Sequence, residues 1–373
     1  MVRFIDWLSV VQEHPDGGLP IVGKEMVTRY DLQTGEIVRA SPNSKLLEGS
    51  HSTYLLVRCD GSRVSVEGNP SRWQRLDNLF GLQTFDQCIH VYNQILEELG
   101  LPIFTKCTKL GWEQGPEGQT AKRITDGALI TRVDFTRNLA VGKGNTLPFL
   151  RALSSQSIGK GKTPYLYPNG RTVDWGKGST YWYQKVYEKA EDLKRSLAKL
   201  SKTGNLPEEE KRYLEKLISH CENEGIIREE REFKSKFLRR NKLCYYGMTE
   251  EKDFDKHLND IEKMIGRLEM SASDYETIAD QLLNRGIVKS RQAATATQSY
   301  HMAWLHGQPF PGSRSQFYVH RGRLLQLGID ISIQHDVSKA FPQIKRTREI
   351  NVATALPPAW YRMPKVTKID LVA

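Results

Sequence analysis

The stretch Thr172-Val-Asp-Trp-Gly-Lys-Gly-Ser-Thr-Tyr-Trp-Tyr-Gln-Lys-Val-Tyr-Glu-Lys189 places three tyrosines among lysines, directly after a glycine-rich turn. The tyrosines are Tyr181, Tyr183 and Tyr187, and the lysines are Lys177, Lys185 and Lys189. A tyrosine hydroxyl is a weak nucleophile at neutral pH, because its pKa is about 10. Neighbouring cations favour the phenolate and also bind phosphate, so the pattern is typical of a tyrosine that attacks a phosphodiester. The alternative is a β-hairpin with half-buried tyrosines and solvated lysines.

Two other segments carry matching chemistry. Arg132-Val-Asp134 lies in a β-branched run, and side chains two residues apart on a strand share a face. The same spacing in Arg228-Glu-Glu-Arg-Glu-Phe-Lys234 puts Arg228, Glu230 and Glu232 on one face. Carboxylates on adjacent strands are typical ligands of Mg²⁺ or Mn²⁺, and arginine binds phosphate with two parallel hydrogen bonds. Each segment alone also fits a surface ion pair, so the hypothesis depends on all three converging.

Local patterns predict the surrounding elements. Tyr54–Cys59 and Arg63–Glu67 flank Asp60-Gly61, which indicates a β-hairpin. Apolar residues at helical spacing predict an amphipathic helix from Phe85 to Leu99, ended by Gly100. The N-terminus favours a first strand over a signal peptide, because Asp6 interrupts its apolar run.

The chain becomes helical and charged after Lys189. Two helices between about residues 190 and 223, divided at Pro207, predict a helical hairpin, which we interpret as a solvated insertion. Strand-like alternation returns after Gly225. Three short helices are expected beyond Met270, at 274–284, 292–305 and 313–327. Their interleaved arginines and aromatics suit a small DNA-binding module, and equally a helical packing domain.

Composition limits the class of protein. The 373 residues carry a net charge of +10, and residues 271–373 hold 13 Lys and Arg against seven acids, which suggests a polyanionic partner. No apolar run approaches the roughly 20 residues that span a bilayer, so no membrane is expected. The five cysteines are scattered without a Cys-x-x-Cys pair, which argues for a reducing cytoplasm and against disulfides or a zinc site. The nine histidines contain no His-x-His pair.

Taken in order, these motifs resemble the gene II/gene X replication initiators of filamentous bacteriophages, over nearly the whole chain. The matching segments are Phe4-Ile-Asp-Trp-Leu8, Thr131-Arg-Val-Asp134, Thr172-Val-Asp-Trp175, Val186-Tyr-Glu-Lys189, Ile227-Arg-Glu-Glu230, Ile350-Asn-Val352 and Trp360-Tyr361. The Arg-x-Asp, Tyr-x-Lys and Arg-x-Glu set is also similar to that of staphylococcal-plasmid rolling-circle initiators.

The resemblance implies an α+β fold. It would comprise an antiparallel-sheet nickase domain over residues 1–250, with the helical hairpin inserted, and a small, mainly helical, gene X-like DNA-binding domain over 251–373. The activity implied is that of a rolling-circle initiator in the host bacterial cytoplasm. Such an enzyme nicks the plus strand of the supercoiled phage origin, and later cuts and rejoins the displaced single strand. A host replicative helicase and a DNA polymerase are implied as partners, and an internal start at Met270 would give a separate C-terminal protein.

The resemblance also assigns roles to residues. Tyr187 would be the nucleophile that forms a phosphotyrosyl link and Lys189 its cationic neighbour, with Tyr183 as the competing nucleophile. Asp134 and Glu230 would bind Mg²⁺ or Mn²⁺, with Glu232 competing with Glu230, while Arg132 and Arg228 would hold phosphate. Two other functions remain as alternatives: a non-catalytic origin-binding regulator, and a metal-dependent nuclease that uses water as its nucleophile.

Overall fold

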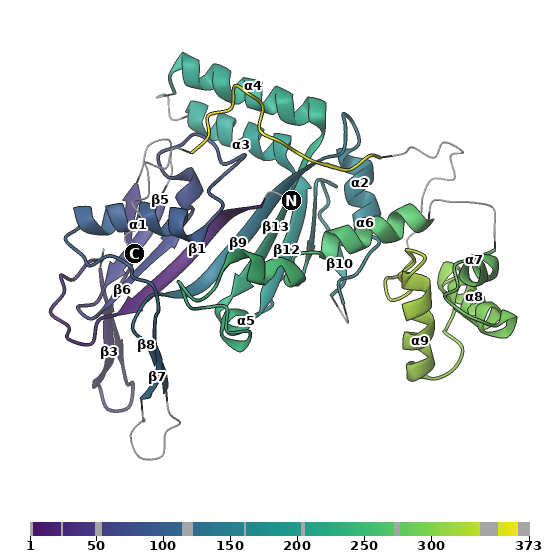
Figure 1. The fold of residues 1–373 in the computed structure, drawn as a ribbon, viewed down its shortest axis with the longest axis horizontal. Coiled ribbons are helices and arrows are strands. Elements are labelled where there is room, and N and C mark those ends of the chain that lie inside the picture. The colour runs from purple at the N-terminus through teal and green to yellow at the C-terminus, as the bar shows by residue number, and fades with distance from the viewer. Residues whose placement is uncertain are drawn as a thin grey trace.

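The computed structural model describes residues 3–23, 25–48, 54–113, 122–159, 162–202, 206–271, 277–335 and 350–364. Its centre is one large antiparallel sheet (Figure 1). Within the described ranges the sheet has ten strands. Nine of them follow one another in the order β10 (Pro164–Leu166), β11 (Thr172–Trp175), β12 (Trp182–Glu188), β13 (Ile226–Lys234), β9 (Leu129–Ala140), β1 (Phe4–Glu13), β6 (Arg63–Gly68), β5 (Tyr54–Cys59) and β4 (Lys45–Glu48), and β14 (Ala353–Thr354) pairs with β9. The expected combination of helices with a large antiparallel sheet is therefore confirmed.

The remaining elements flank this sheet. The helices are α1 (Phe85–Glu98), α2 (Thr146–Leu153), α3 (Lys189–Lys202), α4 (Glu208–Glu224), α5 (Ser235–Arg240), α6 (Asp260–Ser271), α7 (Ile278–Asn284), α8 (Arg291–Leu305) and α9 (Arg314–Leu325), with 3₁₀ turns η2 (Pro70–Arg72) and η3 (Glu251–His257). Two small hairpins, β2 (Met26–Tyr30) with β3 (Ile37–Pro42) and β7 (Leu110–Glu113) with β8 (Lys122–Thr125), project from one end of the molecule (Figure 1).

Several of these elements have clear local causes. The hairpin of β5 and β6 turns at Gly61, whose φ of 99° lies in the region that glycine adopts without strain. Helix α1 begins with a capping box, in which Thr84 accepts from the Gln87 backbone and the Gln87 side chain accepts in return. Helix α4 ends at Gly225 with φ 61°, a left-handed cap. A Cβ at Gly225 would also stand 2.1 Å from a backbone oxygen of Gly142, so this glycine is doubly required.

One face of the sheet is largely apolar and is covered by helices. Phe135 and Phe233 of the central strands pack against Phe85 of α1 and Phe254 of η3, all of them fully or nearly fully buried. Phe254 lies beyond the expected domain boundary at residue 250 but belongs to the same core as the strands. Burying an aromatic side chain of this kind stabilises the fold by about 1.5–3 kcal/mol.

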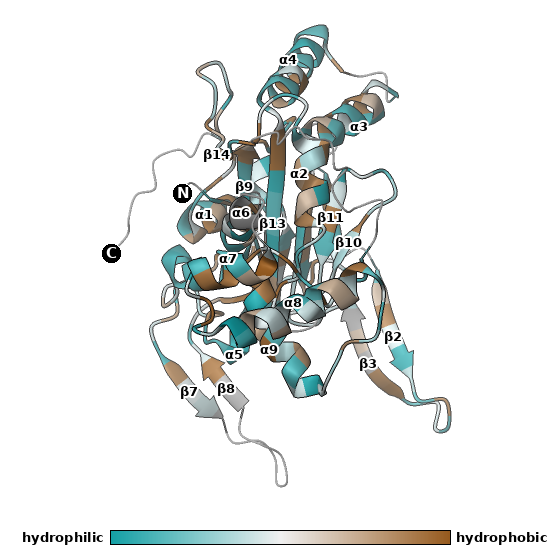
Figure 2. Ribbon diagram, turned by 90° about the vertical axis from the view of Figure 1, so that its right-hand side faces the viewer, coloured by the Kyte–Doolittle hydropathy of each residue, from teal (hydrophilic) through white to brown (hydrophobic). Residues whose placement is uncertain are grey.

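The central strand β13 is hydrophilic along its middle, although it lies in the interior of the sheet (Figure 2). Its alternate residues serve two faces. Glu229 pairs with Arg137 of β9 beneath α6, and the Arg231 guanidinium lies 3.7 Å from the centre of the Trp182 ring. The residues between them point to the opposite face, where the helical hairpin of α3 and α4 lies.

The helical hairpin is not a solvated arm, contrary to the interpretation from the sequence. Leu193 of α3 and Leu214 and Leu217 of α4 are buried with Leu79 and Phe80 of the segment that follows η2. Charged residues dominate the outer face, as the sequence indicates, but the inner face closes a second core over the polar side of the sheet. The hairpin therefore forms one wall of the cavity described below.

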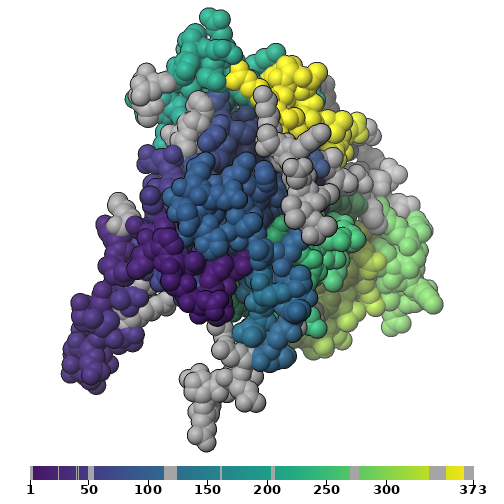
Figure 3. All heavy atoms as spheres, turned by 60° about the vertical axis from the view of Figure 1, so that its left-hand side comes forward, coloured from purple at the N-terminus to yellow at the C-terminus, as the bar shows by residue number. Residues whose placement is uncertain are grey.

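The C-terminal part returns to the sheet after a helical unit of α7, α8 and α9. Arg321 of α9 forms a buried ion pair with Asp330, and both contact Ser157 in the turn after α2. Residues 350–364 then run back as an extended strap beside α4, drawn in yellow next to the teal hairpin (Figures 1 and 3). Within the described ranges, none of the helices combines the length and the apolar character that a membrane span requires.

Candidate functional site

The strand register brings the three chemistry-bearing segments onto one face of the sheet. Lys185 of β12 lies opposite Glu230 of β13, and Tyr187 lies opposite Arg228. On the other side of β13, Glu232 lies opposite Asp134 of β9. Directly paired residues in an antiparallel sheet have neighbouring Cβ atoms on the same face. These side chains therefore share one face of the three central strands.

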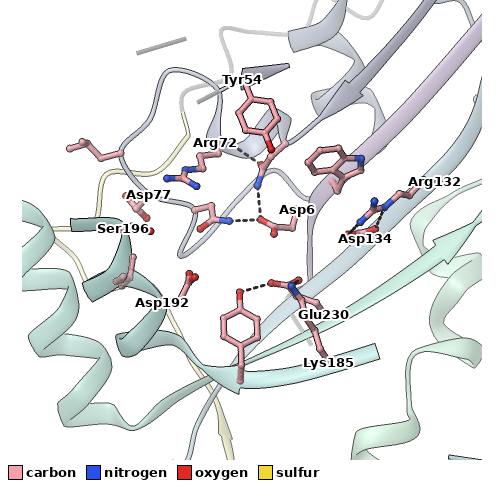
Figure 4. A pocket seen from close by; sticks show the side chains of 16 residues that line it. Asp6, Tyr54, Arg72, Asp77, Arg132, Asp134, Lys185, Asp192, Ser196 and Glu230 are labelled. Carbon is pink, nitrogen blue, oxygen red and sulfur yellow. Dashed lines mark hydrogen bonds and ion pairs between the residues drawn. The ribbon is translucent and has the colours of Figure 1, made fainter. Parts of the chain in front are cut away.

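A cavity of about 280 Å³ opens on this face (Figure 4). Strands β1, β9, β12 and β13 form its floor, α3 forms one wall, and the segment from Asn69 to Asn78 forms another. The cavity is strongly polar, and its charged lining residues are Asp6, Arg72, Asp77, Arg132, Asp134, Lys185, Asp192 and Glu230. A concave site with several convergent ionisable groups is the expected location of catalysis or binding.

Tyr187 lines this cavity and is bonded to a carboxylate. Its hydroxyl donates a hydrogen bond to Glu230 Oε1 at 2.5 Å. The ammonium groups of Lys185 and Lys189 lie 5.1 Å and 5.9 Å from the centre of the Tyr187 ring. The hydroxyl thus has a proton acceptor already in contact and two cations close by.

The protonation state of Tyr187 differs from the expectation from sequence. Burial raises the pKa of the Tyr187 hydroxyl well above its usual value, and the negative charge of Glu230 raises it further, while Arg228 opposes both. The expectation that the lysines favour the phenolate is therefore wrong for the protein alone, because burial and the adjacent carboxylate outweigh the cations. The hydroxyl needs a base to remove its proton.

Glu230 can supply that base. Burial raises its pKa, but the charges of Lys185 and Arg228 and hydrogen bonds from Lys185 and Tyr187 outweigh burial and leave the pKa below its usual value. Lys185 Nζ lies 2.6 Å from Glu230 Oε2, so each carboxylate oxygen has one partner. Glu230 is consequently ionised and poised next to the tyrosine proton.

Arg132 and Asp134 form a two-point ion pair at the rim of the cavity. The Arg132 guanidinium donates from Nε and Nη2 to the two Asp134 oxygens at 2.9 Å and 2.7 Å (Figure 4). Burial raises the pKa of Asp134 to about 7, despite the opposing effect of Arg132. Glu232 pairs with Arg132 at 3.4 Å and with Lys234 at 3.5 Å, and it does not line the cavity.

Arg228 and Lys189 are more deeply placed than the sequence suggests. The Arg228 guanidinium is fully buried and donates to Asn138 Oδ1 and to the backbone oxygens of Asn78 and Leu79. Lys189 is also buried, and its ammonium group donates to Asn78 Oδ1 at 3.1 Å and pairs with Asp192 at 2.6 Å. Both cations therefore fasten the walls of the cavity and influence Tyr187 through space.

Tyr183 has a different environment from Tyr187. Its hydroxyl donates to Asp174 at 2.9 Å, and Tyr167 donates to the same carboxylate at 3.0 Å. Tyr183 does not line the cavity. Burial and Asp174 raise its pKa as well. The two tyrosines compete on sequence spacing but differ in which of them faces the convergent charges.

Two family models match the chain, and both describe the replication-associated protein that gene II of filamentous phages encodes. The N-terminal model of that protein matches residues 4–254, and its C-terminal model matches residues 282–367. The chain belongs to this family of phage replication-associated proteins. The resemblance to filamentous-phage gene II/gene X initiators is thereby confirmed at the level of the family.

Individual relatives agree with this membership. The chain is 41% identical over 314 residues to the replication-associated protein of Escherichia phage If1, covering 83% of this chain and 97% of that protein. It also matches the structure of a rolling circle replication initiator protein from Geobacillus stearothermophilus, at 15% identity over 64% of this chain and 76% of that one. The TM-score of that match is 0.26, which is too low to carry an argument.

The cavity of this gene II-family chain contains residues that the sequence did not assign. Asp6 accepts hydrogen bonds from Asn69 at 2.8 Å and Asn78 at 2.6 Å, and it lies 4.0 Å from Arg228. Lys185 belongs to the opening motif but was assigned no role, although its position two residues before Tyr187 put it on the same face. The Asn69–Asn78 segment has no periodicity from which its position could have been predicted.

The carboxylates suit a hard cation in kind, but they are not assembled as a metal site. Asp134, Glu230 and Asp6 offer oxygen ligands to the same cavity, as Mg²⁺ and Mn²⁺ prefer. In the described part of the chain, however, no group of three or more His, Cys, Asp or Glu side chains is close enough to hold a metal ion. Both oxygens of Asp134 and of Glu230 already accept from Arg132, Lys185 or Tyr187. A cation would have to displace a protein partner.

Proposed function

We propose that this protein is a rolling-circle replication initiator that nicks the plus strand of a phage origin through a tyrosine. The observation that carries the proposal is the hydrogen bond from Tyr187 to the ionised Glu230, inside a cavity lined by Arg132 and Lys185. Membership of the gene II protein family supports replication as the context. The same site later cuts and rejoins the displaced single strand.

The chemical step is a transesterification. Tyr187 Oη attacks the phosphorus atom while its proton passes to Glu230, so a bond from Oη to phosphorus forms as the bond from phosphorus to the 3′ oxygen breaks. The leaving 3′ oxygen takes up a proton, and the 5′ phosphate remains linked to the tyrosine. In rejoining, a 3′ hydroxyl attacks that link and Tyr187 recovers its proton. General base catalysis of this kind contributes about 10²–10⁴ in rate.

The cations around Tyr187 divide into two groups. Arg132 is the phosphate-binding candidate, since its side chain is 35% exposed at the rim and its planar guanidinium fits phosphate oxygens. Lys185 neutralises Glu230 and can follow the charge as it moves to the tyrosine. Arg228 and Lys189 lie too deep to reach a phosphate and act on the electrostatics of the site. A Mg²⁺ or Mn²⁺ ion bound by Asp134 and Glu230 would polarise a phosphoryl oxygen.

The proposal extends to the partners. The substrates are the supercoiled duplex origin and the single-stranded plus strand, and a host helicase and DNA polymerase extend the new 3′ end in the bacterial cytoplasm. Residues 251–373, which include α8 and α9 with their exposed arginines, are proposed as the gene X-like, DNA-binding part. The split at residue 250 divides function, since η3 packs in the core of the sheet.

The test compares wild type with Tyr187→Phe and Tyr183→Phe on supercoiled DNA of the parent replicon with Mg²⁺. Gels are run with and without protease. The proposal expects wild type to nick one strand and to retain protein on the DNA until protease removes it. Tyr187→Phe should lose both properties, whereas Tyr183→Phe should keep both, because its hydroxyl bonds to Asp174 outside the cavity.

Each alternative gives a different result. Cleavage that persists in both variants shows that water is the nucleophile and the enzyme is a hydrolytic nuclease. Binding of the origin without cleavage by wild type, under Mg²⁺ or Mn²⁺, shows a non-catalytic regulator. Loss of nicking in Tyr183→Phe alone moves the nucleophile to Tyr183.

A further inference from the structure

The rim of the cavity carries two aromatic side chains that the proposed chemistry does not use. Trp7 of β1 and Tyr54 of β5 both line the cavity. Tyr54 is 48% exposed, whereas the next residue of its strand, Leu55, is completely buried. The sheet register explains their arrangement. Leu8 and Leu55 both lie opposite Gly68, so Trp7 and Tyr54 flank the end of β6, roughly 10 Å apart at the backbone.

A β-bulge turns Trp7 into the cavity. Consecutive residues of a regular strand point to opposite faces, yet Asp6 and Trp7 both line this cavity. The pairing of β1 with β9 shifts register between Ile5 and Trp7, and such a bulge re-aims the side chains that follow it. The Trp7 indole N–H donates to Ser9 Oγ at 3.1 Å, and the Arg132 guanidinium lies 5.0 Å from the centre of the indole ring. The ring is therefore held in a fixed orientation.

Arg72 adds an unused cationic donor beside these rings. It lies at the end of η2, whose N-cap Asn69 accepts from the Arg72 backbone at 2.9 Å. The Arg72 side chain lines the cavity, and its Nε is buried without a hydrogen-bond partner among the residues that the structure describes. Tyr54 and Arg72 lie on the side of the cavity opposite Lys185 and Glu230 (Figure 4). A buried, unpaired guanidinium N–H is costly unless a ligand completes it.

We propose that Trp7, Tyr54 and Arg72 form a subsite for one unpaired nucleotide next to the phosphate that Tyr187 attacks. The base stacks against the aromatic wall of Trp7 and Tyr54, and Arg72 binds the phosphate of that nucleotide. Aromatic platforms combined with cations are how proteins bind single-stranded nucleic acid without reading its sequence. Bases of an intact duplex are stacked on one another, so the subsite selects DNA that is already melted or extruded. This inference rests on the proposed function, since it deepens the substrate of the same cavity.

The test measures binding alone, so that it does not depend on the nucleophile. The full-length protein carries Tyr187→Phe, and EDTA is present. The probes are a fluorescently labelled oligothymidylate of about 12 nucleotides, within the usual site size of single-strand binders, and a duplex of the same length. Tyr54→Leu should weaken binding of the single strand by about tenfold and leave duplex binding unchanged, whereas Tyr54→Phe should bind like its parent. Arg72→Gln should weaken binding and lower the salt slope of the single strand by about one charge.

Tyr54 is the decisive position, because its exposed side chain can be changed without disturbing the core. Trp7→Ala also removes the partner of Arg132, so it is read only together with Tyr54→Leu. A second readout is cleavage of a single-stranded oligonucleotide by protein with Tyr187 intact, where Tyr54→Leu should raise KM and leave kcat within about twofold. Equal single-strand binding by Tyr54→Leu and its parent, or an equal loss on duplex DNA, overturns the subsite. The nicking assay with Tyr187→Phe decides the proposed function separately.

Discussion

Tyr361, near the end of the chain, donates its hydroxyl hydrogen to Asp77 at 2.7 Å, across 284 positions of sequence. The same hydroxyl accepts from the Phe80 backbone N–H at 2.8 Å and from Arg75 at 2.9 Å. Asp77 is followed by Asn78, whose side chain bonds to both Asp6 and Lys189. The C-terminal strap therefore fixes the wall of the cavity that faces Tyr187.

Replacing this tyrosine tests the strap. Tyr361→Phe keeps the ring but leaves the buried Asp77 carboxylate and the Phe80 N–H with fewer partners, so the free energy of unfolding should fall by about 1–3 kcal/mol. Denaturant titration measures it. Tyr318→Phe, at a tyrosine of α9 that is 45% exposed, is the matched control and should change stability by less than about 0.5 kcal/mol. Equal stability of the two variants would show that the strap does not hold the wall.

Much of the sheet follows from the sequence because period-two alternation and turn residues act locally. That rule places Arg132 with Asp134, and Glu230 with Glu232, on shared faces, and β9, β12 and β13 obey it. The hairpin at Gly61 similarly needs only its own turn. These predictions depend on neighbours in sequence, and so they survive folding.

What the sequence could not provide arises from non-local contacts and from burial. The bulge after Ile5 reverses the facing of Asp6 and Trp7, and nothing in the local pattern indicates it. Asp77 reaches the cavity because Tyr361 holds it there. The pKa of Tyr187 was misjudged because a sequence shows which cations are near but not how much water is excluded.

The roles of the two neighbouring glutamates can be separated by amide substitution. Glu230→Gln keeps the shape but cannot accept the Tyr187 proton, so nicking should slow by about 10²–10⁴. Glu232→Gln is the control, because Glu232 contacts Arg132 and Lys234 outside the cavity, and its effect should stay below about tenfold. Nicking rates at a single turnover measure both. A larger loss in Glu232→Gln would move the catalytic carboxylate by one pair of residues.

Asp134 should couple stability and metal binding to pH. Its pKa is about 7 in the folded protein and about 3.9 when unfolded, so the folded state binds the extra proton between these values. That stabilisation is full below pH 4 and is lost as pH rises through 7. In EDTA, wild type should therefore lose stability relative to Asp134→Asn between pH 5 and 8, by a few kcal/mol at most, at about 1.4 kcal/mol per pH unit.

The same group makes the opposite prediction once a divalent ion is present. Mg²⁺ binds the ionised carboxylate, so the rise in Tm caused by Mg²⁺ should be larger at pH 8 than at pH 6, and absent in Asp134→Asn. Thermal unfolding at matched ionic strength measures both series. A pH-independent difference between wild type and variant in EDTA would mean that Asp134 stays ionised against Arg132 throughout.

The buried ion pair of Arg321 and Asp330 should determine whether the C-terminal helical unit stays docked on the sheet. Arg321 Nε and Nη2 donate to the two Asp330 oxygens at 2.8 Å and 2.9 Å, and both residues contact Ser157. Arg321→Ala leaves the Asp330 carboxylate buried without its cation, which typically costs about 3–5 kcal/mol. Hydrogen exchange should then rise in α9 and in the turn at Ser157, while the core around Phe135 stays protected. Arg314→Ala, at an exposed arginine of the same helix, should leave exchange unchanged. If Arg321→Ala instead loosens the whole sheet, the helical unit and the sheet unfold as one cooperative body.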